Sequence, residues 1–318
     1  MININGIILT AAISIFICLI PARAQKFSFV ETGEGILLKY NNQHIFFYQT
    51  ETKSHDGLYP RANYIHPLYG LNGEILTEDF PEDHLHHRGI FWAWHQLYVK
   101  GQRVGDPWEC KGITWRINHT EYKASQDTAV LITRLTWEEN LPGKANANPG
   151  GLIGEETVIT CIKNKEDQLE INFDIRLTAL HDGTRIGGSE DVKGYSGFSI
   201  RTKLPDDLTF YSSSGKVIPR ETAIDAGGWI NMQATFEPGR EQQTSITLMC
   251  DPNDPMPFHG WILRDKGSMQ NAAFPGRDPV SIPEGKTLSM QYKILLHRPD
   301  MSREQIGQIY NQFIRKKD

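Results

Sequence analysis

The sequence predicts an all-β protein, a large antiparallel β-sandwich (supersandwich-like) with one helix at its C-terminal end. Short apolar runs are separated throughout by turns, and the chain holds 28 Gly and 17 Pro. A helical pattern occurs only near the end. No linker, internal repeat or low-complexity tract divides residues 25–318, so we expect a single domain. A domain of this size needs two large, curved sheets packed face to face, which leaves one concave face exposed for a ligand.

The first element is a predicted signal peptide over residues 1–24. Gly6 to Ile20 is an apolar run of signal length, short for a transmembrane span. Ala22-Arg23-Ala24 matches an A-x-A cleavage site, so we expect the mature chain to begin at Gln25. The segment before the apolar run lacks Lys and Arg, which leaves an uncleaved membrane anchor as the alternative. Cleavage predicts a periplasmic or secreted protein without stable membrane insertion.

The strands expected in the mature chain begin with a meander and continue through four longer strands. Pro60 to Tyr69 holds two prolines and several aromatics, so we expect an edge strand or loop there, not a central strand. Residues 169–177 alternate strictly between apolar and polar, which predicts a strand with one face in the core. The expected strands are 27–30, 35–40, 44–49, 113–122, 128–137, 154–163, 169–178, 197–204, 208–212, 229–236, 245–250 and 288–297, and loops are expected at 143–151 and 251–257.

The last element is a predicted helix. Ser302 and Gln305 match a capping box, in which each side chain bonds the other residue's backbone N–H. Ile306, Ile309 and Phe313 follow at helical spacing. This pattern predicts one apolar face that docks on the sheets.

Charge and cysteine content exclude some classes of partner and fold. The formal charge is -5, and no Lys/Arg run precedes residues 315–317, which argues against nucleic acid. Cys110, Cys161 and Cys250 remain after cleavage, and this odd number permits at most one intramolecular disulfide. Cys161 lies in an apolar run and is expected to be a buried small hydrophobe.

The densest chemical signature is the segment 83–95, DHLHHRGIFWAWH, which holds four of the 11 histidines and two of the seven tryptophans. Histidine is well suited to proton transfer near neutral pH and is the commonest metal ligand. If the segment is extended, His84 and His86 point to one face and His87 to the other, unless Gly89 breaks the register.

Three interpretations of this segment stay open. His84 and His86 could bind one divalent metal, the only cofactor that we consider. A metal-free site could use one histidine as general acid or base, oriented by Asp83, with Arg88 holding a carboxylate or oxyanion. A polar turn whose histidines bond backbone groups is the third interpretation. The candidates for a third metal ligand are Glu109, His95 and His259.

Tryptophans near the histidines suggest a sugar platform. Trp92 and Trp94 share the parity of His84 and His86, although one side of this alternating run must fill the core. Flat aromatic faces stack well on the apolar faces of sugars. A carbohydrate cleft therefore fits these tryptophans and Trp108.

Carboxylates are the next requirement, because glycoside hydrolysis commonly uses two, and lyases or epimerases need an acid and a base. Glu109 is the best candidate. Glu155 and Glu156 open a strand, one expected inward and one outward, with solvation expected for either. The predicted catalytic residues are His84, His86, His87, Arg88, Glu109 and His259. The predicted substrate-binding residues are Trp94, His95, Trp108, Arg176, Tyr195 and Arg264.

Four sequence pieces also carry a family resemblance. They are DHLHHRG at 83–89 followed by Phe91-Trp92, GD and WE within 105–109, GYSGF at 194–198 and HGWILR at 259–264. With these pieces the chain resembles the bacterial PmoA-like family, a domain of unknown function once labelled methane oxygenase. The resemblance implies a β-sandwich protein of polysaccharide-degrading bacteria, encoded near sugar-processing enzymes. The architecture is also similar to galactose mutarotase-like supersandwiches, at the level of fold.

Together these features predict an exported carbohydrate-active enzyme that acts on a glycan or glycoside as a hydrolase, lyase or epimerase. A His/Arg/Glu site with a Trp platform would carry the reaction. One alternative is a non-catalytic carbohydrate-binding protein that uses the same cleft. The other is a metal-dependent oxidoreductase, in the sense of the methane oxygenase label.

Overall fold

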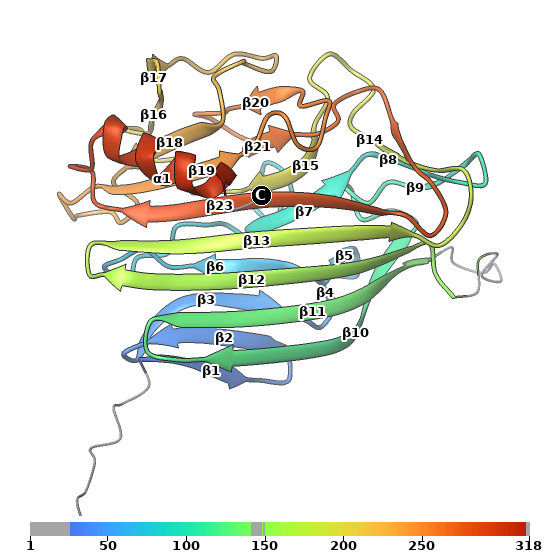
Figure 1. Ribbon diagram of the computed structural model, residues 1–318, viewed down its shortest axis with the longest axis horizontal. Coiled ribbons are helices and arrows are strands. Elements are labelled where there is room, and N and C mark those ends of the chain that lie inside the picture. The colour runs from blue at the N-terminus through green and yellow to red at the C-terminus, as the bar shows by residue number, and fades with distance from the viewer. Residues whose placement is uncertain (1–25, 141–147, 149, 316–318) are drawn as a thin grey trace, which may run out of the picture.

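The computed structural model describes residues 26–140, 148 and 150–315 (Figure 1). The predicted signal peptide and most of the predicted loop at 143–151 lie outside the described residues. The described chain is an all-β sandwich with one C-terminal helix, as the sequence predicts. None of its helices is long and apolar enough to cross a membrane.

Two large antiparallel sheets form the sandwich. The first has the order β1-β2-β3-β6-β7-β15-β21-β20, and the second has the order β10-β11-β12-β13-β23-β19-β18-β16-β17. The strands of the first sheet are β1 Phe27–Glu31, β2 Gly35–Tyr40, β3 Gln43–Gln49, β6 Tyr64–Leu68, β7 Ile90–Trp94, β15 Ser196–Ile200, β20 Gly260–Ile262 and β21 Gln270–Ala273. Those of the second sheet are β10 Ile113–Ala124, β11 Thr128–Glu139, β12 Ile153–Lys165, β13 Gln168–Ala179, β16 Thr209–Ser212, β17 Gly215–Val217, β18 Trp229–Ala234, β19 Thr244–Cys250 and β23 Thr287–His297.

Two small sheets complete the fold. The four-stranded sheet contains β8 Gln96–Val99, β9 Gln102–Gly105, β14 Thr184–Gly187 and β22 Val280–Ile282. The two-stranded sheet contains β4 Lys53–His55 and β5 Leu58–Arg61. The sequence pattern does not predict these strands, because three or four residues carry too little periodicity. Every strand that the pattern does predict overlaps an observed one.

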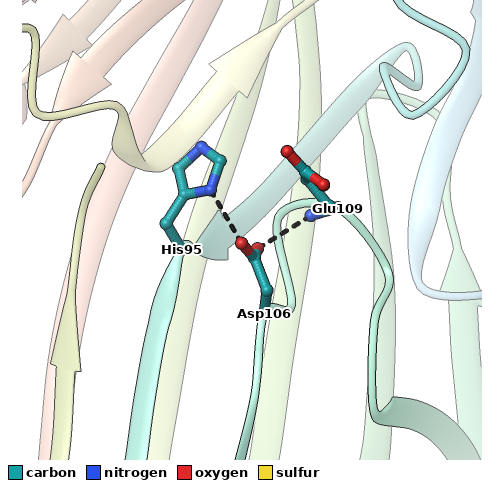
Figure 2. Close-up of side chains that lie close together, drawn as sticks. All are labelled: His95, Asp106 and Glu109. Carbon is teal, nitrogen blue, oxygen red and sulfur yellow. Dashed lines mark hydrogen bonds and ion pairs between the residues drawn. The ribbon is translucent and has the colours of Figure 1, made fainter. Parts of the chain in front are cut away.

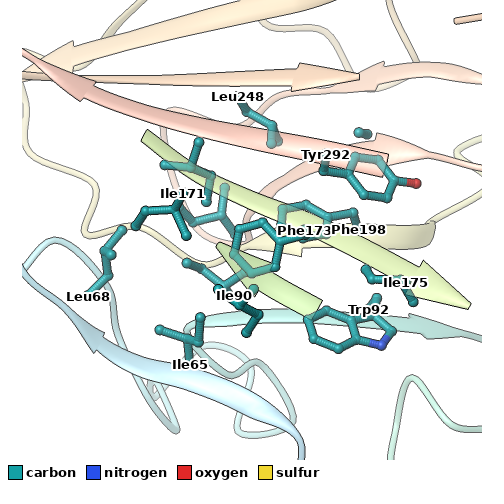
Figure 3. Packing of buried hydrophobic residues seen from close by; sticks show 14 of the residues in the cluster. Ile65, Leu68, Ile90, Trp92, Ile171, Phe173, Ile175, Phe198, Leu248 and Tyr292 are labelled. Atoms are coloured by element: carbon teal, nitrogen blue, oxygen red, sulfur yellow. The ribbon is translucent and has the colours of Figure 1, made fainter. Parts of the chain in front are cut away.

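The core lies between the two large sheets, and β7 and β13 face each other across it. The rings of Trp92 on β7 and Phe173 on β13 are 6.3 Å apart (Figure 3). Trp92 and Trp94 belong to this core, whereas Phe91 and Ala93 pack with Trp108 in a separate cluster. Because side chains alternate along a strand, this second cluster lies on the other face of the first sheet. That face carries the candidate site.

The segment around β6 corrects one prediction. Pro60 to Tyr69 is not confined to an edge or loop, because β6 lies between β3 and β7 in the first sheet. Its pairing to β7 consists of the single pair Ile65 and Ile90. Pro67 has no N–H to donate, and this short pairing to β7 does not require one. Gly89 permits the close approach, because a Cβ at this position would lie 2.0 Å from the Ile65 carbonyl oxygen.

Glu155 on β12 corrects a second prediction. Its side chain is not solvated but buried in the core, where desolvation raises its pKa. Its four hydrogen-bond donors are Asn63 Nδ2, Trp92 Nε1, Trp137 Nε1 and Thr157 Oγ1, at 2.7–2.8 Å. Glu156 lies on the opposite face and pairs with Arg134 at 2.7 Å. The expected inward and outward pair is therefore confirmed, while solvation of the inward member is wrong.

Helix α1, Arg303–Arg315, confirms the predicted capping box. Ser302 Oγ accepts the Gln305 N–H at 3.2 Å, and Gln305 Oε1 accepts the Ser302 N–H at 2.8 Å. Ile306 and Phe313 pack against side chains of β18, β19 and β23, so α1 covers the outer face of the second sheet (Figure 1).

Cys110, Cys161 and Cys250 are all buried. Cys161 lies in the core as predicted, and burial raises the pKa of its thiol. Cys110 and Cys161 are free thiols, so no disulfide joins two of the cysteines that the structure describes.

Candidate active site

A turn, not a strand, carries the three neighbouring histidines between β6 and β7. The His84 N–H donates to the Pro81 carbonyl at 3.0 Å, and the His87 N–H donates to the His84 carbonyl at 2.9 Å. The predicted extended geometry, with His87 opposite His84 and His86, is wrong because these local bonds fold the segment back. The His87 ring stacks on that of His84 at 4.5 Å and meets that of His86 edge-on at the same separation.

Asp83 and Arg201 fix this turn to the first sheet. Two Arg201 nitrogens bond the two Asp83 oxygens at 2.7 and 3.0 Å, which is a bidentate pair. The Ser268 N–H adds a bond to Asp83 at 2.7 Å. Partial burial would raise the Asp83 pKa, but bonds from Arg201, His84 and Ser268 hold it well below its usual range.

The turn forms one wall of a pocket of about 480 Å³, here called the histidine pocket. Its imidazoles are those of His84, His86, His87 and His95. Its other rings are Trp108 and Tyr195, whose centroids are 5.6 Å apart. The rest of the lining comes from Ser189, Asp191, Lys193, Arg264, Lys266, Gly267 and Ser268. The pocket thus joins four distant parts of the chain, near residues 84–95, 108, 189–195 and 264–268.

His95 has an orienting carboxylate. Its Nδ1 lies 3.0 Å from Asp106 Oδ2, and its ring stacks on Trp108 at 5.1 Å. Asp106 is itself held by the Glu109 N–H, which donates to Oδ1 at 3.0 Å (Figure 2). In a neutral ring whose Nδ1–H donates to a carboxylate, Nε2 is a proton acceptor. In Figure 2 this second nitrogen points away from Asp106.

The same pocket contains a second histidine that is paired with a carboxylate, and two neutral imidazoles. His84 Nδ1 lies 2.9 Å from Asp83 Oδ2. Burial lowers the pKa of His86 to about 4 and also lowers the pKa of His87, which lies deeper. Both rings are therefore uncharged at neutral pH. The site combines two carboxylate-oriented histidines with two histidines that do not add charge.

Comparison with known protein families gives one match. The model of a family of unknown function (DUF6807) matches residues 35–311. The chain belongs to this family. The match includes the whole histidine pocket, and the family's description assigns no activity to it. No curated protein matches the chain.

Two predicted site residues of this family member lie away from the pocket. Arg88 is fully buried, forms an ion pair with Asp79 at 3.2 Å and stacks on Phe80. Trp94 is fully buried in the core and donates from Nε1 to the Phe274 carbonyl at 2.7 Å. Strand parity and the turn direct both side chains into the protein, so neither lines the histidine pocket.

Arg176 and His259, two further predicted site residues, also lie outside the histidine pocket. Arg176 lies on the outer face of the second sheet, where it pairs with Glu156 at 3.0 Å and Asp174 at 2.9 Å. His259 lines a neighbouring hollow, and its Nε2 lies 3.0 Å from the Lys193 carbonyl oxygen. His259 thus supports the 189–195 loop from outside the histidine pocket.

A divalent cation has one candidate position among the described residues. Donor atoms of His95, Asp106 and Glu109 all lie within 4.8 Å of one another, and His84 and His86 are not part of this group. Lys111 already contacts the Glu109 carboxylate, and Asp106 already bonds His95. A metal there would replace these contacts.

Sequence reasoning identified His84, His86, His87, His95, Trp108, Tyr195 and Arg264 in the pocket, but missed the residues that hold them. Arg201 is a single arginine at the end of a predicted strand, and its partner Asp83 is 118 positions away. No local motif marks such a pair. The proximity of Asp106 to His95, 11 positions apart across a hairpin, was the one signal that could have been found.

Proposed function

We propose that this protein is an exported carbohydrate-active enzyme that transfers a proton to or from a sugar bound in the histidine pocket. The observation that carries the proposal is His95, oriented by Asp106 and stacked on Trp108 within one pocket. Its volume of about 480 Å³ lies within the range of small-molecule sites. Export rests on the predicted signal peptide of residues 1–24, and the PmoA-like and mutarotase-like resemblances agree with a sugar ligand.

In the proposed mechanism His95 is the general base. The Asp106 carboxylate holds Nδ1–H, keeps Nε2 ready to accept a proton and stabilises the imidazolium that forms. Trp108 and Tyr195 supply the flat surfaces on which a sugar ring stacks. The Tyr195 hydroxyl, 3.4 Å from Ser268 Oγ, is the candidate acid.

The lining favours a lyase or epimerase over a hydrolase. The carboxylates in and beside the lining are already engaged by other groups. Asp191 accepts bonds from Ser189 Oγ and the Lys193 N–H at 2.7 and 3.0 Å. Asp106 bonds His95, and Glu109, the predicted catalytic carboxylate, contacts Lys111. Glycoside hydrolysis commonly needs two available carboxylates. The same lining offers several imidazoles and a phenol, which suit proton abstraction and return.

The test uses the full mature chain and a panel of glycans, followed by mass spectrometry and kinetics. We expect His95→Asn and Asp106→Asn to lower kcat on an identified substrate by about 10²-fold or more. Trp108→Ala should mainly raise KM. His44→Asn, an exposed histidine beside Tyr69, is the matched control and should leave both constants unchanged.

Three outcomes contradict the proposal. Unchanged turnover in all three pocket variants would remove the pocket from catalysis. Tight binding of a sugar that the wild type never converts would instead favour a carbohydrate-binding protein. A stoichiometric redox metal in protein purified without a His tag would favour the oxidoreductase alternative, with His95, Asp106 and Glu109 as the candidate ligands.

A further inference from the structure

The histidine pocket has an excess of positive charge. Its lining contains the cations Arg264, Lys193 and Lys266 and the carboxylate Asp191. Three more carboxylates adjoin the lining histidines: Asp83 is neutralised by Arg201 and Glu109 by Lys111, whereas Asp106 bonds His95. Three cations therefore face the two carboxylates Asp191 and Asp106. Among the described residues none of the three cations forms an ion pair. The neutral His86 and His87 do not add to this charge. A pocket with unpaired cations attracts an anionic ligand.

Arg264 is the most fixed of the three cations. Its Nη1 donates to the Arg220 carbonyl at 2.6 Å and to the Leu263 carbonyl at 2.8 Å, and its Nη2 donates to the Glu221 carbonyl at 2.8 Å. Its guanidinium lies over the Tyr195 ring, 5.5 Å from the centroid. Carbonyl oxygens orient a guanidinium but leave its unit charge uncompensated. A half-buried, oriented arginine is well suited to bind a carboxylate.

We propose that the substrate is an acidic sugar, whose carboxylate binds Arg264 with the help of Lys193 and Lys266. The proton that His95 removes is then the one on the carbon that bears this carboxylate. This inference rests on the proposed function and names its substrate class. A sulfated or phosphorylated sugar would share the anion contact, but its anionic group would not acidify a neighbouring C–H bond in the same way.

The chemical step balances without an oxidant or reductant. The C–H bond breaks, its proton moves to His95 Nε2, and its electron pair spreads into the carboxylate, which becomes an enediolate dianion. The cationic side chains of Arg264, Lys193 and Lys266 stabilise this added charge. Return of a proton from the Tyr195 hydroxyl to the opposite face gives an epimer, and the resulting phenolate and His95 imidazolium then exchange their protons with solvent. Expulsion of the oxygen substituent on the next carbon, with a proton from Tyr195, gives an unsaturated sugar.

The experiment compares acidic oligosaccharides with their own methyl esters. Oligomers of galacturonic, glucuronic, mannuronic and guluronic acid are titrated into the full mature chain by calorimetry. We expect at least one acid to bind 10-fold or more tightly than its ester, which corresponds to about 1.4 kcal/mol. The same acid in D₂O should gain deuterium at the carbon beside the carboxylate, or give a product that absorbs as an unsaturated uronate.

Arg264→Gln should lose this 10-fold preference for the acid while binding the ester as the wild type does. Arg185→Gln is the matched control, because Arg185 is also half-buried and stacked on a tyrosine, Tyr98, but lies outside the pocket. Lys266→Gln alters an exposed side chain and keeps the test valid if Arg264→Gln fails to fold. In Lys266→Gln the preference for the acid over its methyl ester should also decrease, by a smaller factor than in Arg264→Gln.

The outcomes separate the two proposals. Turnover of neutral sugars or esters with no preference for acids overturns the acidic substrate and leaves the proposed enzyme intact. Preferential binding of sulfated sugars, with no deuterium incorporated into any uronate, also overturns the acidic substrate and leaves the proposed enzyme intact. Binding of an acid with neither deuterium uptake nor product in the wild type supports the anion site and overturns the enzyme. If no acidic or neutral sugar binds, both the acidic substrate and the proposed enzyme are contradicted.

Discussion

At the residue scale, the neighbouring Glu155 and Glu156 show how strand parity separates identical side chains. Glu155 points into the core and receives four hydrogen bonds, whereas Glu156 pairs with exposed arginines on the outer face. A buried carboxylate is tolerated only when such bonds offset its desolvation. Glu155 therefore connects β7 and β11 across the core as a structural group, and the mechanism needs no proton from it.

We expect Glu155→Gln to lower the free energy of unfolding by about 2 kcal/mol, because the new amide NH₂ opposes a buried donor such as Trp137 Nε1–H. Glu156→Gln, the matched control, should cost less than about 1 kcal/mol. Urea denaturation at neutral pH measures both. Equal effects of the two substitutions would contradict the structural role of Glu155.

At the scale of elements, the turn between β6 and β7 determines the site. Backbone hydrogen bonds fold it, and Arg201 anchors it from the end of β15. The turn brings His84, His86 and His87 together, which an extended strand could not do. The hairpin of β8 and β9 similarly brings Asp106 back to His95.

We expect Arg201→Met to release this turn, because it leaves Asp83 without its bidentate partner. Since Asp83 is partly exposed, the loss of stability should be about 2–3 kcal/mol, below that of a fully buried pair. Ligand binding in the histidine pocket should weaken at the same time. Arg103→Met, which breaks an exposed pair with Glu190, is the control. Retention of full stability and binding by Arg201→Met would show that the turn keeps its conformation without Arg201.

The elements themselves could largely be predicted from sequence. The alternation of residues 169–177 reports burial of one face, and the capping box marks where α1 begins. Both signals depend only on neighbouring residues, so they can be recognised without knowledge of the fold. The candidate site could be predicted only in part, because its orienting partners Arg201 and Ser268 lie 118 and 185 positions from Asp83.

At the scale of the whole molecule, buried neutral histidines couple stability to pH. Burial lowers the pKa of His66 and His297 to about 4, from the usual 6.5. Between these values the unfolded chain binds protons that the folded chain excludes. The free energy of unfolding must therefore fall as the pH drops from about 6.5 to 4.

We expect the urea midpoint to decrease steadily over this range, and His297→Gln to make the decrease shallower. His119→Gln, which changes an exposed histidine on β10, should leave the slope unchanged. Chemical denaturation at several pH values measures the slopes. A midpoint that stays constant between about pH 6.5 and 5 would contradict the prediction.

The sequence by itself determined the all-β class, the strand faces, the helix cap and the density of histidines at 84–95, because period, capping and composition are local properties. The tertiary structure alone decided that Arg88 and Trp94 turn inward, that Arg176 lies on the second sheet, and that Arg264 lines the same pocket as the histidines. Period-2 alternation tells which side chains share a face of a strand. Which other segments meet that face depends on sheet order and packing, and these are fixed only when the chain folds.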